Sequence, residues 1–273
     1  MRLEGGKMMT ENVINILDDI KKHSPLVHHI TNYVTVNDCA NIALAIGASP
    51  VMAQDINEVA DMVSIAKALV INIGTLSASS VEAMIVAGQK AKKIGVPIIF
   101  DPVGVGATPY RNSVADRILA EVRPDVIRGN ISEIKCLSGF ASKTKGVDSL
   151  EDDNGIEEIG LNLAKKIQGV IAITGKRDLI ISEKEAVYLD NGDFMLTKVT
   201  GTGCMTSTLI GCAVGSGNVF WGAVAGVCFM GIAGEIAKEK LQVGEGLGSY
   251  RVRLLDAISN LDRTSVEKYI KIV

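Results

Sequence analysis

Residues 201–204 read Gly-Thr-Gly-Cys, and a run of small residues follows them. This pattern predicts a glycine turn that opens directly into a helix, with Cys204 in the first turn. The start of a helix offers free backbone N–H groups and a positive dipole end, both of which bind anions. We therefore expect an accessible Cys204, whose thiolate the helix dipole favours, beside a site that stabilises negative charge.

Several residues that could bind a ligand or take part in catalysis follow short apolar runs, which are typical of strands. They stand at or just after the predicted strand ends: Asn32, Met52, Asp101, Arg128 and Thr174. In an open parallel sheet, ligands bind beyond the carboxyl ends of the strands. We therefore expect these five positions to share one edge of the sheet with the turn at Gly201.

Asp101 is followed by a loop of mostly small residues, Pro-Val-Gly-Val-Gly-Ala-Thr. Mg²⁺ keeps most of its hydration and takes only one or two carboxylates, so Asp101 is suited to hold Mg²⁺ through water beside phosphate groups. The alternative is an Asp-Pro turn in which Asp101 binds nearby backbone. The sequence alone leaves both interpretations open.

The segment Arg-Gly-Asn-Ile-Ser-Glu at residues 128–133 supplies Arg128 for a polyphosphate and Glu133 one turn into the next helix. A capping box between Asn130 and Glu133 is the alternative for the carboxylate, and both roles are compatible. Thr174 ends another strand with a hydroxyl suited to nucleotide phosphates. The chain has neither a GxxxxGKS/T phosphate loop nor a GxGxxG fingerprint after its first strand, which excludes those two nucleotide-binding classes.

The other four cysteines are interpreted as small buried hydrophobic residues: Cys39, Cys136, Cys212 and Cys228. The five cysteines are odd in number, scattered and without a CxxC pair, which argues against a disulfide framework or a structural zinc site. This usage fits a reducing compartment, and we expect a cytoplasmic protein. The three histidines, all between residues 23 and 29, give no signature for a Cys–His pair with Cys204, although such a pair stays open.

Short apolar runs alternate with helical segments as far as residue 174. Helices are expected at residues 11–22, 37–46, 80–93 and 156–167, and strands at residues 26–30, 50–52, 68–72, 96–101, 125–127 and 169–174. This alternation predicts an α/β fold with a mostly parallel sheet covered by helices on both faces. Residues 179–199 read as antiparallel edge strands with a turn at 190–192, residues 142–155 as a flexible loop, and the chain beyond Cys204 as mostly helical. A single domain over residues 1–273 is the expected organisation.

Composition excludes several classes of function. A net charge of −3 with no long block of one sign argues against a nucleic-acid partner. Residues 219–234 are the most membrane-like segment, but they fall short of the roughly 20 apolar residues that a spanning helix needs. We therefore expect a buried helix there and no membrane partner, and we find no secretion signal at the N-terminus.

Five stretches, in order along nearly the whole chain, resemble the hydroxyethylthiazole kinases of thiamine salvage. They are LVHHITNYVTVN at residues 26–37, GASPVMA at 47–53, DPVGVGAT from Asp101, RGNISEI from Arg128 and GTGC from Gly201. Each motif is modest alone, but their joint order is specific.

The resemblance implies a ribokinase-like three-layer α/β/α fold and transfer of the ATP γ-phosphoryl group to the primary hydroxyl of 4-methyl-5-(2-hydroxyethyl)thiazole. It also implies a homotrimer with active sites at subunit interfaces. The implied roles are thiazole binding by Asn32, Met52 and Gly201, ATP binding by Arg128 and Thr174, and organisation of Mg²⁺ and the phosphates by Asp101 and Glu133. Cys204 stands at the position where related sugar and vitamin kinases carry an aspartate base. Members of the family that the chain resembles carry a cysteine at this position.

From its place in the glycine turn, we hypothesise that Cys204 orients the acceptor hydroxyl and accepts its proton late in the reaction. One alternative is another kinase of the same fold, acting on a hydroxymethylpyrimidine, pyridoxal or a sugar alcohol, although residues 28–37 and Met52 favour thiazole. Two further alternatives are an ADP-dependent hydro-lyase on a similar scaffold and a catalytically silent sensor of small molecules.

Overall fold

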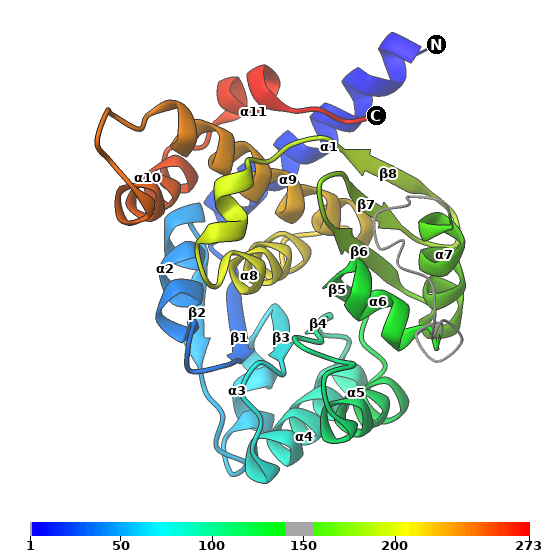
Figure 1. Ribbon diagram of the computed structural model, residues 1–273. Coiled ribbons are helices and arrows are strands. Elements are labelled where there is room, and N and C mark those ends of the chain that lie inside the picture. The colour runs from blue at the N-terminus through cyan, green and yellow to red at the C-terminus, as the bar shows by residue number, and fades with distance from the viewer. Residues whose placement is uncertain (1, 140–154) are drawn as a thin grey trace.

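An eight-stranded sheet forms the centre of the computed structural model, which describes residues 2–139 and 155–273 (Figure 1). The strands are β1 Leu26–Ile30, β2 Ser49–Met52, β3 Ala68–Asn72, β4 Ile98–Asp101, β5 Val126–Asn130, β6 Val170–Thr174, β7 Asp178–Ile181 and β8 Ala186–Leu189. Their order across the sheet is β2-β1-β3-β4-β5-β6-β7-β8. Pairing is parallel from β2 across to β6 and antiparallel from β6 to β8, which confirms the predicted mostly parallel sheet with an antiparallel edge.

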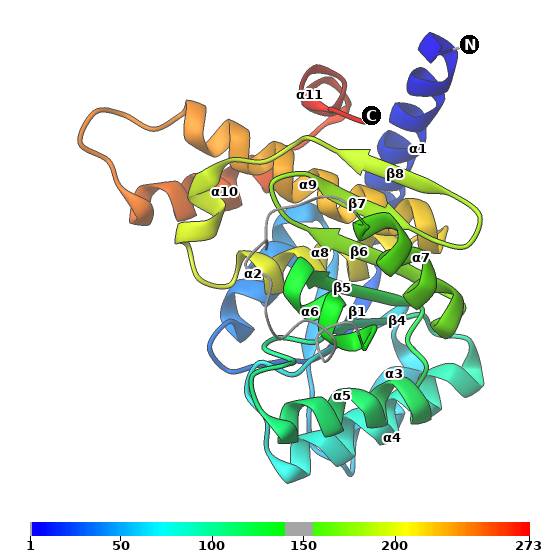
Figure 2. The same ribbon diagram turned by 45° about the vertical axis from the view of Figure 1, so that its right-hand side comes forward.

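Helices cover both faces of the sheet, which gives three layers (Figures 1 and 2). Their bounds are α1 Arg2–His23, α2 Val36–Ile46, α3 Val59–Ile65, α4 Ala78–Ile94, α5 Pro109–Glu121, α6 Ile131–Leu137, α7 Ile156–Ile167, α8 Thr202–Val214, α9 Val219–Glu239, α10 Leu247–Ser259 and α11 Arg263–Tyr269, with a 3-10 helix η2 at Phe194–Lys198. One face packs against α3 to α7, and the other packs against α1, α2, α8 and α9. The helices α10 and α11 pack against α9.

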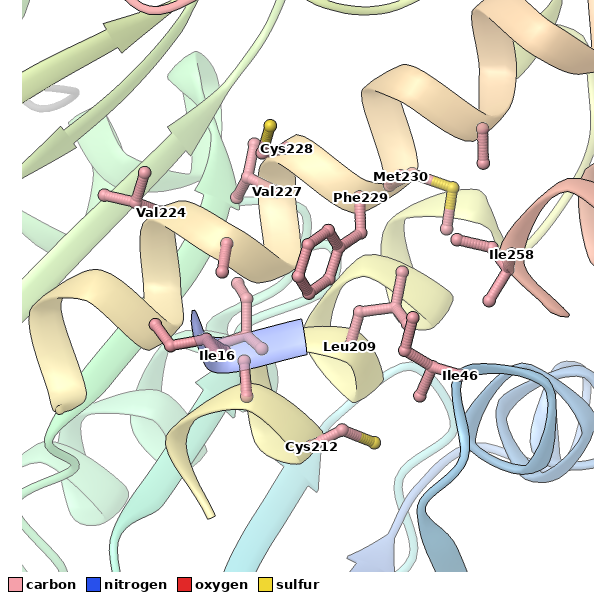
Figure 3. Close-up of a cluster of buried hydrophobic side chains, with 14 of the residues drawn as sticks. Ile16, Ile46, Leu209, Cys212, Val224, Val227, Cys228, Phe229, Met230 and Ile258 are labelled. Atoms are coloured by element: carbon pink, nitrogen blue, oxygen red, sulfur yellow. The ribbon is translucent and has the colours of Figure 1, made fainter. Parts of the chain in front are cut away.

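The strands distribute their side chains between these layers with the two-residue period of a pleated strand. Val70 of β3 lies in the core beneath α8 and α9, whereas its neighbour Leu69 lies in the core beneath α3 to α7. Figure 3 shows part of the first core, where side chains of α8 and α9 pack with Ile16 of α1, Ile46 of α2 and Ile258 of α10.

The helix α9 is long and apolar enough to cross a membrane by length and composition. However, 83% of its most apolar stretch is buried within the fold, where it contacts α8, α10, β6 and β7. The predicted buried helix at residues 219–234 is therefore confirmed, but the argument from its short length is wrong, because the helix continues to Glu239. Its apolar character comes from packing on several sides.

Helices α1, α3 and α5 differ from the sequence predictions, which begin α1 at residue 11 and contain neither α3 nor α5. The first turns of α1 precede residue 11, and exposed residues such as Lys7 and Met8 provide no apolar stripe that would reveal them. The seven-residue α3 buries only Val59 and Val63, so its pattern is too short to predict a helix.

The segment after β7 also differs from the prediction. The hairpin between β7 and β8 turns at residues 182–185, and the expected turn at 190–192 instead leads out of β8. Residues 194–198 form η2 rather than an edge strand. Of the loop predicted at residues 142–155, all but Gly155 lies outside the described residues.

Candidate active site

Four polar residues lie at the ends of the middle strands, on the face of the sheet that α8 covers. They are Asn72, Asp101, Arg128 and Thr174. Each lies two residues after a buried residue of the core beneath α8, and therefore shares its face of the sheet. Adjacent strands are in register here, with Asn72 opposite Asp101 and Asn130 opposite Thr174. The carboxyl ends of β3 to β6 thus form one polar rim.

The rim meets the start of α8 at Cys204. Gly201 precedes this helix with a φ of 86°, in the left-handed region that favours glycine. Asn32, from the loop after β1, donates from Nδ2 to Cys204 Sγ at 3.4 Å, and Asn72 Nδ2 donates to the same sulfur at 3.3 Å. We call Asn32, Asn72, Asp101, Cys204 and Ser207 the Cys204 cluster.

Burial raises the pKa of the Cys204 thiol above its ordinary value, and the negative charge of Asp101 adds to this effect. Hydrogen bonds that involve Thr35, Asn72 and Asn32 oppose the shift. The lowered pKa expected at the helix start is therefore not found, whereas the expected accessibility holds in part, since Cys204 is only partly buried. Desolvation is the largest cause of the shift and favours the neutral thiol of this partly buried side chain.

Asp101 is fully buried at the centre of the rim. Its Oδ2 accepts hydrogen bonds from Asn72 Nδ2 and Ser207 Oγ, each at 2.8 Å, whereas its Oδ1 has no hydrogen-bond partner. Burial raises the pKa of Asp101 to about 6, although Arg128 and both hydrogen bonds oppose the shift. The alternative in which Asp101 binds nearby backbone does not hold, since these partners are side chains.

Arg128 connects the Cys204 cluster with a neighbouring cavity. Its Nη1 lies 3.9 Å from Asp101 Oδ1, and its Nη2 donates to Thr174 Oγ1 at 2.6 Å. A side chain at Gly203 would overlap with the guanidinium, because a Cβ atom there meets Arg128 Nη1 well inside van der Waals contact. Glycine at position 203 therefore allows Arg128 to lie against the start of α8.

The cavity has a volume of about 710 Å³ and lies between the ends of β5 and β6, the segment around η2, and the helices α8 and α9. Arg128 and Thr174 line it together with Phe194, Val227 and Met230. Asp178 also lines it and accepts a hydrogen bond from the Gly175 N–H at 2.9 Å. Burial raises the pKa of Asp178 to about 7.

Glu133 forms the capping box that the sequence allowed. Its Oε2 accepts from the Asn130 N–H, and Asn130 Oδ1 accepts from the Glu133 N–H, both at 2.9 Å. Its Oε1 accepts from the Gly104 N–H at 2.9 Å and so connects the loop after β4 with the start of α6. The charge of Glu133 contributes to the raised pKa of Asp101.

Met52 ends the edge strand β2, in register with His29 of the neighbouring β1. Met52 therefore lies one strand away from the strand that leads to Asn32. The ring of His28 hydrogen-bonds the Ala53 carbonyl at 2.7 Å, and the ring of His29 hydrogen-bonds the Val27 carbonyl at 3.0 Å. These contacts tie both buried histidines to backbone beside the edge strand rather than to a Cys–His pair.

The remaining cysteines agree in part with their interpretation as buried hydrophobic residues. Cys39, Cys212 and Cys228 are buried, whereas Cys136 is only partly so. Burial raises the pKa of Cys39 and Cys212 to about 12. These two thiols are therefore poor nucleophiles.

Comparison with known proteins identifies the family of this chain. The family model described as "Hydroxyethylthiazole kinase family" matches residues 17–264. A protein of Alkaliphilus oremlandii named hydroxyethylthiazole kinase is 50% identical over 266 residues, which cover 97% of this chain and 98% of the relative. The chain belongs to the hydroxyethylthiazole kinase family.

Solved structures support the same family and its fold. The structure of a hydroxyethylthiazole kinase protein from Pyrococcus horikoshii OT3 matches with a TM-score of 0.88 at 34% identity, over 96% of this chain and 98% of that one. A ribokinase-like superfamily protein from Enterococcus faecalis V583 matches with a TM-score of 0.63 at 14% identity, over 89% and 87% of the two chains, which shows the fold alone. The predicted family and ribokinase-like fold are confirmed.

Three residues of the candidate site were not identified from the sequence. Asn72 closes β3 as Asp101 closes β4, so a polar residue at the end of an apolar run was the available signal. Ser207 lies three residues after Cys204, on the same face of the predicted helix. Thr35 donates from its N–H and its hydroxyl to Asn32 Oδ1. No sequence pattern predicts this local contact within the loop.

Proposed function

We propose that this chain transfers the γ-phosphoryl group of ATP to the primary hydroxyl of 4-methyl-5-(2-hydroxyethyl)thiazole. The family and the names of its relatives support this activity. The observation that supports it most directly is the position of Arg128, which lies beside Asp101 of the Cys204 cluster and also lines the cavity. A nucleotide in the cavity and a hydroxyl at Cys204 would meet at this positive charge.

ATP would bind in the 710 Å³ cavity, whose size is ordinary for a small-molecule site. Arg128 and Thr174 would contact the phosphates at the end of the cavity next to Cys204. The hydrogen bond between these two side chains fixes the guanidinium, so its charge is oriented before the nucleotide arrives. The apolar side chains of Val227 and Met230 offer a surface for the base.

Mg²⁺ would be held by Asp101 and Glu133. The donors fit this hard cation, since Asp101 Oδ1 is buried without a hydrogen-bond partner and backbone N–H groups orient both oxygens of Glu133. Across residues 2–139 and 155–273, no group of three or more His, Cys, Asp or Glu could hold a metal. Water and phosphate oxygens would therefore complete the coordination, and the bound ion would neutralise phosphate charge.

The Cys204 cluster would bind the acceptor, with Cys204 orienting the hydroxyl and Asn32, Met52 and Gly201 contacting the thiazole. A thiol that keeps its own proton cannot accept another, so the raised pKa of Cys204 favours the orienting role. Phosphoryl transfer passes through a loose transition state and depends mainly on positioning and charge stabilisation. Proton acceptance by Cys204 would require its thiolate.

A coupled assay of ADP release tests the proposal with hydroxyethylthiazole, hydroxymethylpyrimidine, pyridoxal and ribose as acceptors. Strong turnover with hydroxyethylthiazole alone, together with its phosphate detected by mass spectrometry, is the expected result. Equal or greater turnover of another alcohol would assign a different kinase activity. ATP hydrolysis without a phosphorylated alcohol would favour a hydro-lyase, and ligand binding without turnover would favour a sensor.

We also propose a cytoplasmic homotrimer with active sites at subunit interfaces. Two large apolar side chains next to Asn32 support an interface there, since Tyr33 is 79% exposed and Val34 is 58% exposed. Light scattering should give three times the chain mass of 28.9 kDa. A monomer at assay concentrations would contradict the trimer without affecting the proposed reaction.

A further inference from the structure

Asn72 uses every hydrogen-bonding position of its side-chain amide. Its Nδ2 donates to Asp101 Oδ2 at 2.8 Å and to Cys204 Sγ at 3.3 Å. Its Oδ1 accepts from Asn32 Nδ2 and from the Gly74 N–H, each at 2.9 Å. Turning the amide over would oppose donors to donors and an oxygen to a carboxylate, so these four partners fix its orientation.

Asn72 controls both N–H contacts to the sulfur of Cys204. One of them comes from Asn72 itself, and the other comes from Asn32 Nδ2, which also donates to Asn72 Oδ1. Removing the Asn72 amide therefore deletes one contact and leaves the donor of the other without its acceptor. Asp101 is less dependent on Asn72, because Ser207 still donates to the same carboxylate oxygen.

Asn72 itself is almost completely covered by its neighbours and has little surface that a substrate could contact. Its side chain is only 1% exposed, and it is not among the residues that line the nucleotide cavity. Its effect on catalysis must therefore pass through the residues that it contacts. Of these, Cys204 is the one that faces the acceptor hydroxyl in the proposed function.

We propose that Asn72 is a positioning residue, which holds the sulfur of Cys204 in place to orient the acceptor hydroxyl. This inference rests on the proposed thiazole kinase activity. It goes beyond that activity by assigning the geometry of Cys204 to a buried amide on β3. Small displacements of a reacting group are costly, about 10²-fold in rate for roughly 1 Å.

A double-mutant cycle tests the proposal, with kcat and both KM values measured for the wild type, Asn72→Leu, Cys204→Ala and the double variant. Asn72→Leu should lower kcat by about 10- to 100-fold and change the KM for ATP by less than about 3-fold. In the Cys204→Ala background, the same substitution should lower kcat by a much smaller factor, because the sulfur that Asn72 positions is absent.

Ser207→Ala is the matched control, because Ser207 donates to the same Asp101 oxygen as Asn72 but is not a donor to the sulfur. It should lower kcat by the same factor with and without Cys204. The residual effect of Asn72→Leu in the Cys204→Ala background should not exceed the effect of Ser207→Ala. Thermal unfolding checks that each variant is folded, and Asn72→Ala replaces Asn72→Leu if the larger side chain prevents folding.

If the Asn72 substitution lowers kcat by the same factor in the wild type and in Cys204→Ala, the inference is overturned and Asn72 is a structural residue only. Normal kcat in the single Asn72 variant would overturn it as well. A wild-type chain that releases no ADP with hydroxyethylthiazole would instead refute the proposed function, so the two failures are distinguishable.

Discussion

The Cys204 cluster and the nucleotide cavity adjoin at Arg128, yet they are built differently. In the cluster, buried amide, carboxylate and hydroxyl groups hydrogen-bond one another at 2.8 to 2.9 Å, and two amides donate to the Cys204 sulfur at 3.3 and 3.4 Å. The cavity has a more open wall, where Phe194 is 70% exposed and several glycines contribute backbone. The acceptor side is therefore ordered in advance, whereas the donor side has room to adapt. Changes in the cluster should act mainly on kcat, and changes in the cavity mainly on the KM for ATP.

The largest effect is expected where the two regions share a residue. Arg128→Ala should lower kcat/KM for ATP by about 10³-fold, through both kcat and KM, because one oriented donor to developing charge contributes roughly 10²- to 10³-fold. Steady-state kinetics with varied ATP measures both constants. Arg117→Ala is the control, since this arginine pairs at the surface with Glu82 and Glu121. Normal turnover with a normal KM for ATP would exclude the proposed role of Arg128.

A substitution confined to the cluster should separate kcat from KM. Cys204→Ala should lower kcat by up to about 10²-fold and leave the KM for ATP nearly unchanged, because the sulfur is not among the residues that line the cavity. Cys212→Ala, on the same helix but within the core, controls for the loss of a thiol. If kcat is unchanged in Cys204→Ala, Cys204 has no role in the reaction, and any contribution of the cluster to kcat comes from its other residues.

The buried ring of His29, on the strand that leads to Asn32, should make the stability of the protein depend on pH. Burial lowers the pKa of His29 on β1 from 6.5 to about 4, so the unfolded chain takes up a proton first as the pH falls. Stability should therefore decrease below pH 6.5, by about 2 kcal/mol between pH 7 and pH 5 for this residue. In denaturant unfolding, the free energy of unfolding of His29→Phe should fall by about 2 kcal/mol less than that of the wild type between pH 7 and pH 5. An identical pH slope in both proteins would mean that His29 is hydrated in the folded state.

The smallest effect should come from the boundary itself. Gly203→Ala should raise the KM for ATP by about tenfold, because its methyl group pushes the Arg128 guanidinium away from the start of α8. Gly217→Ala is the matched control, since a Cβ atom there meets nothing within 4 Å. Equal KM values for the two variants would show that the guanidinium moves without consequence.

The sequence predicts the fold well because its signals are local. Short apolar runs mark β1 to β6, and helical periodicity marks α2, α4 and α7. The same signals fail for α3, which buries too few side chains, and for η2, whose 3-10 turn has no apolar period. Pro109 at the start of α5, after the N-cap Thr108, is a signal that could have revealed that helix.

The site is predicted less completely, because its energetics depend on contacts between distant segments. Strand ends identify Asp101, Arg128 and Thr174, but Asn72 becomes significant only when the register of β3 against β4 is known. The pKa of Cys204 shows the same limit. A helix start predicts a lowered value, whereas desolvation by the surrounding fold raises it.

The pleat of the strands has an evolutionary consequence. Phe100 and Asp101 are consecutive but belong to opposite faces of β4, so an insertion of one residue before them would exchange a core aromatic ring with the buried carboxylate. Packing and chemistry would then be lost in the same event. Selection for a stable interior thus also protects the reactive end of the strand, and length changes should be confined to the loops between elements.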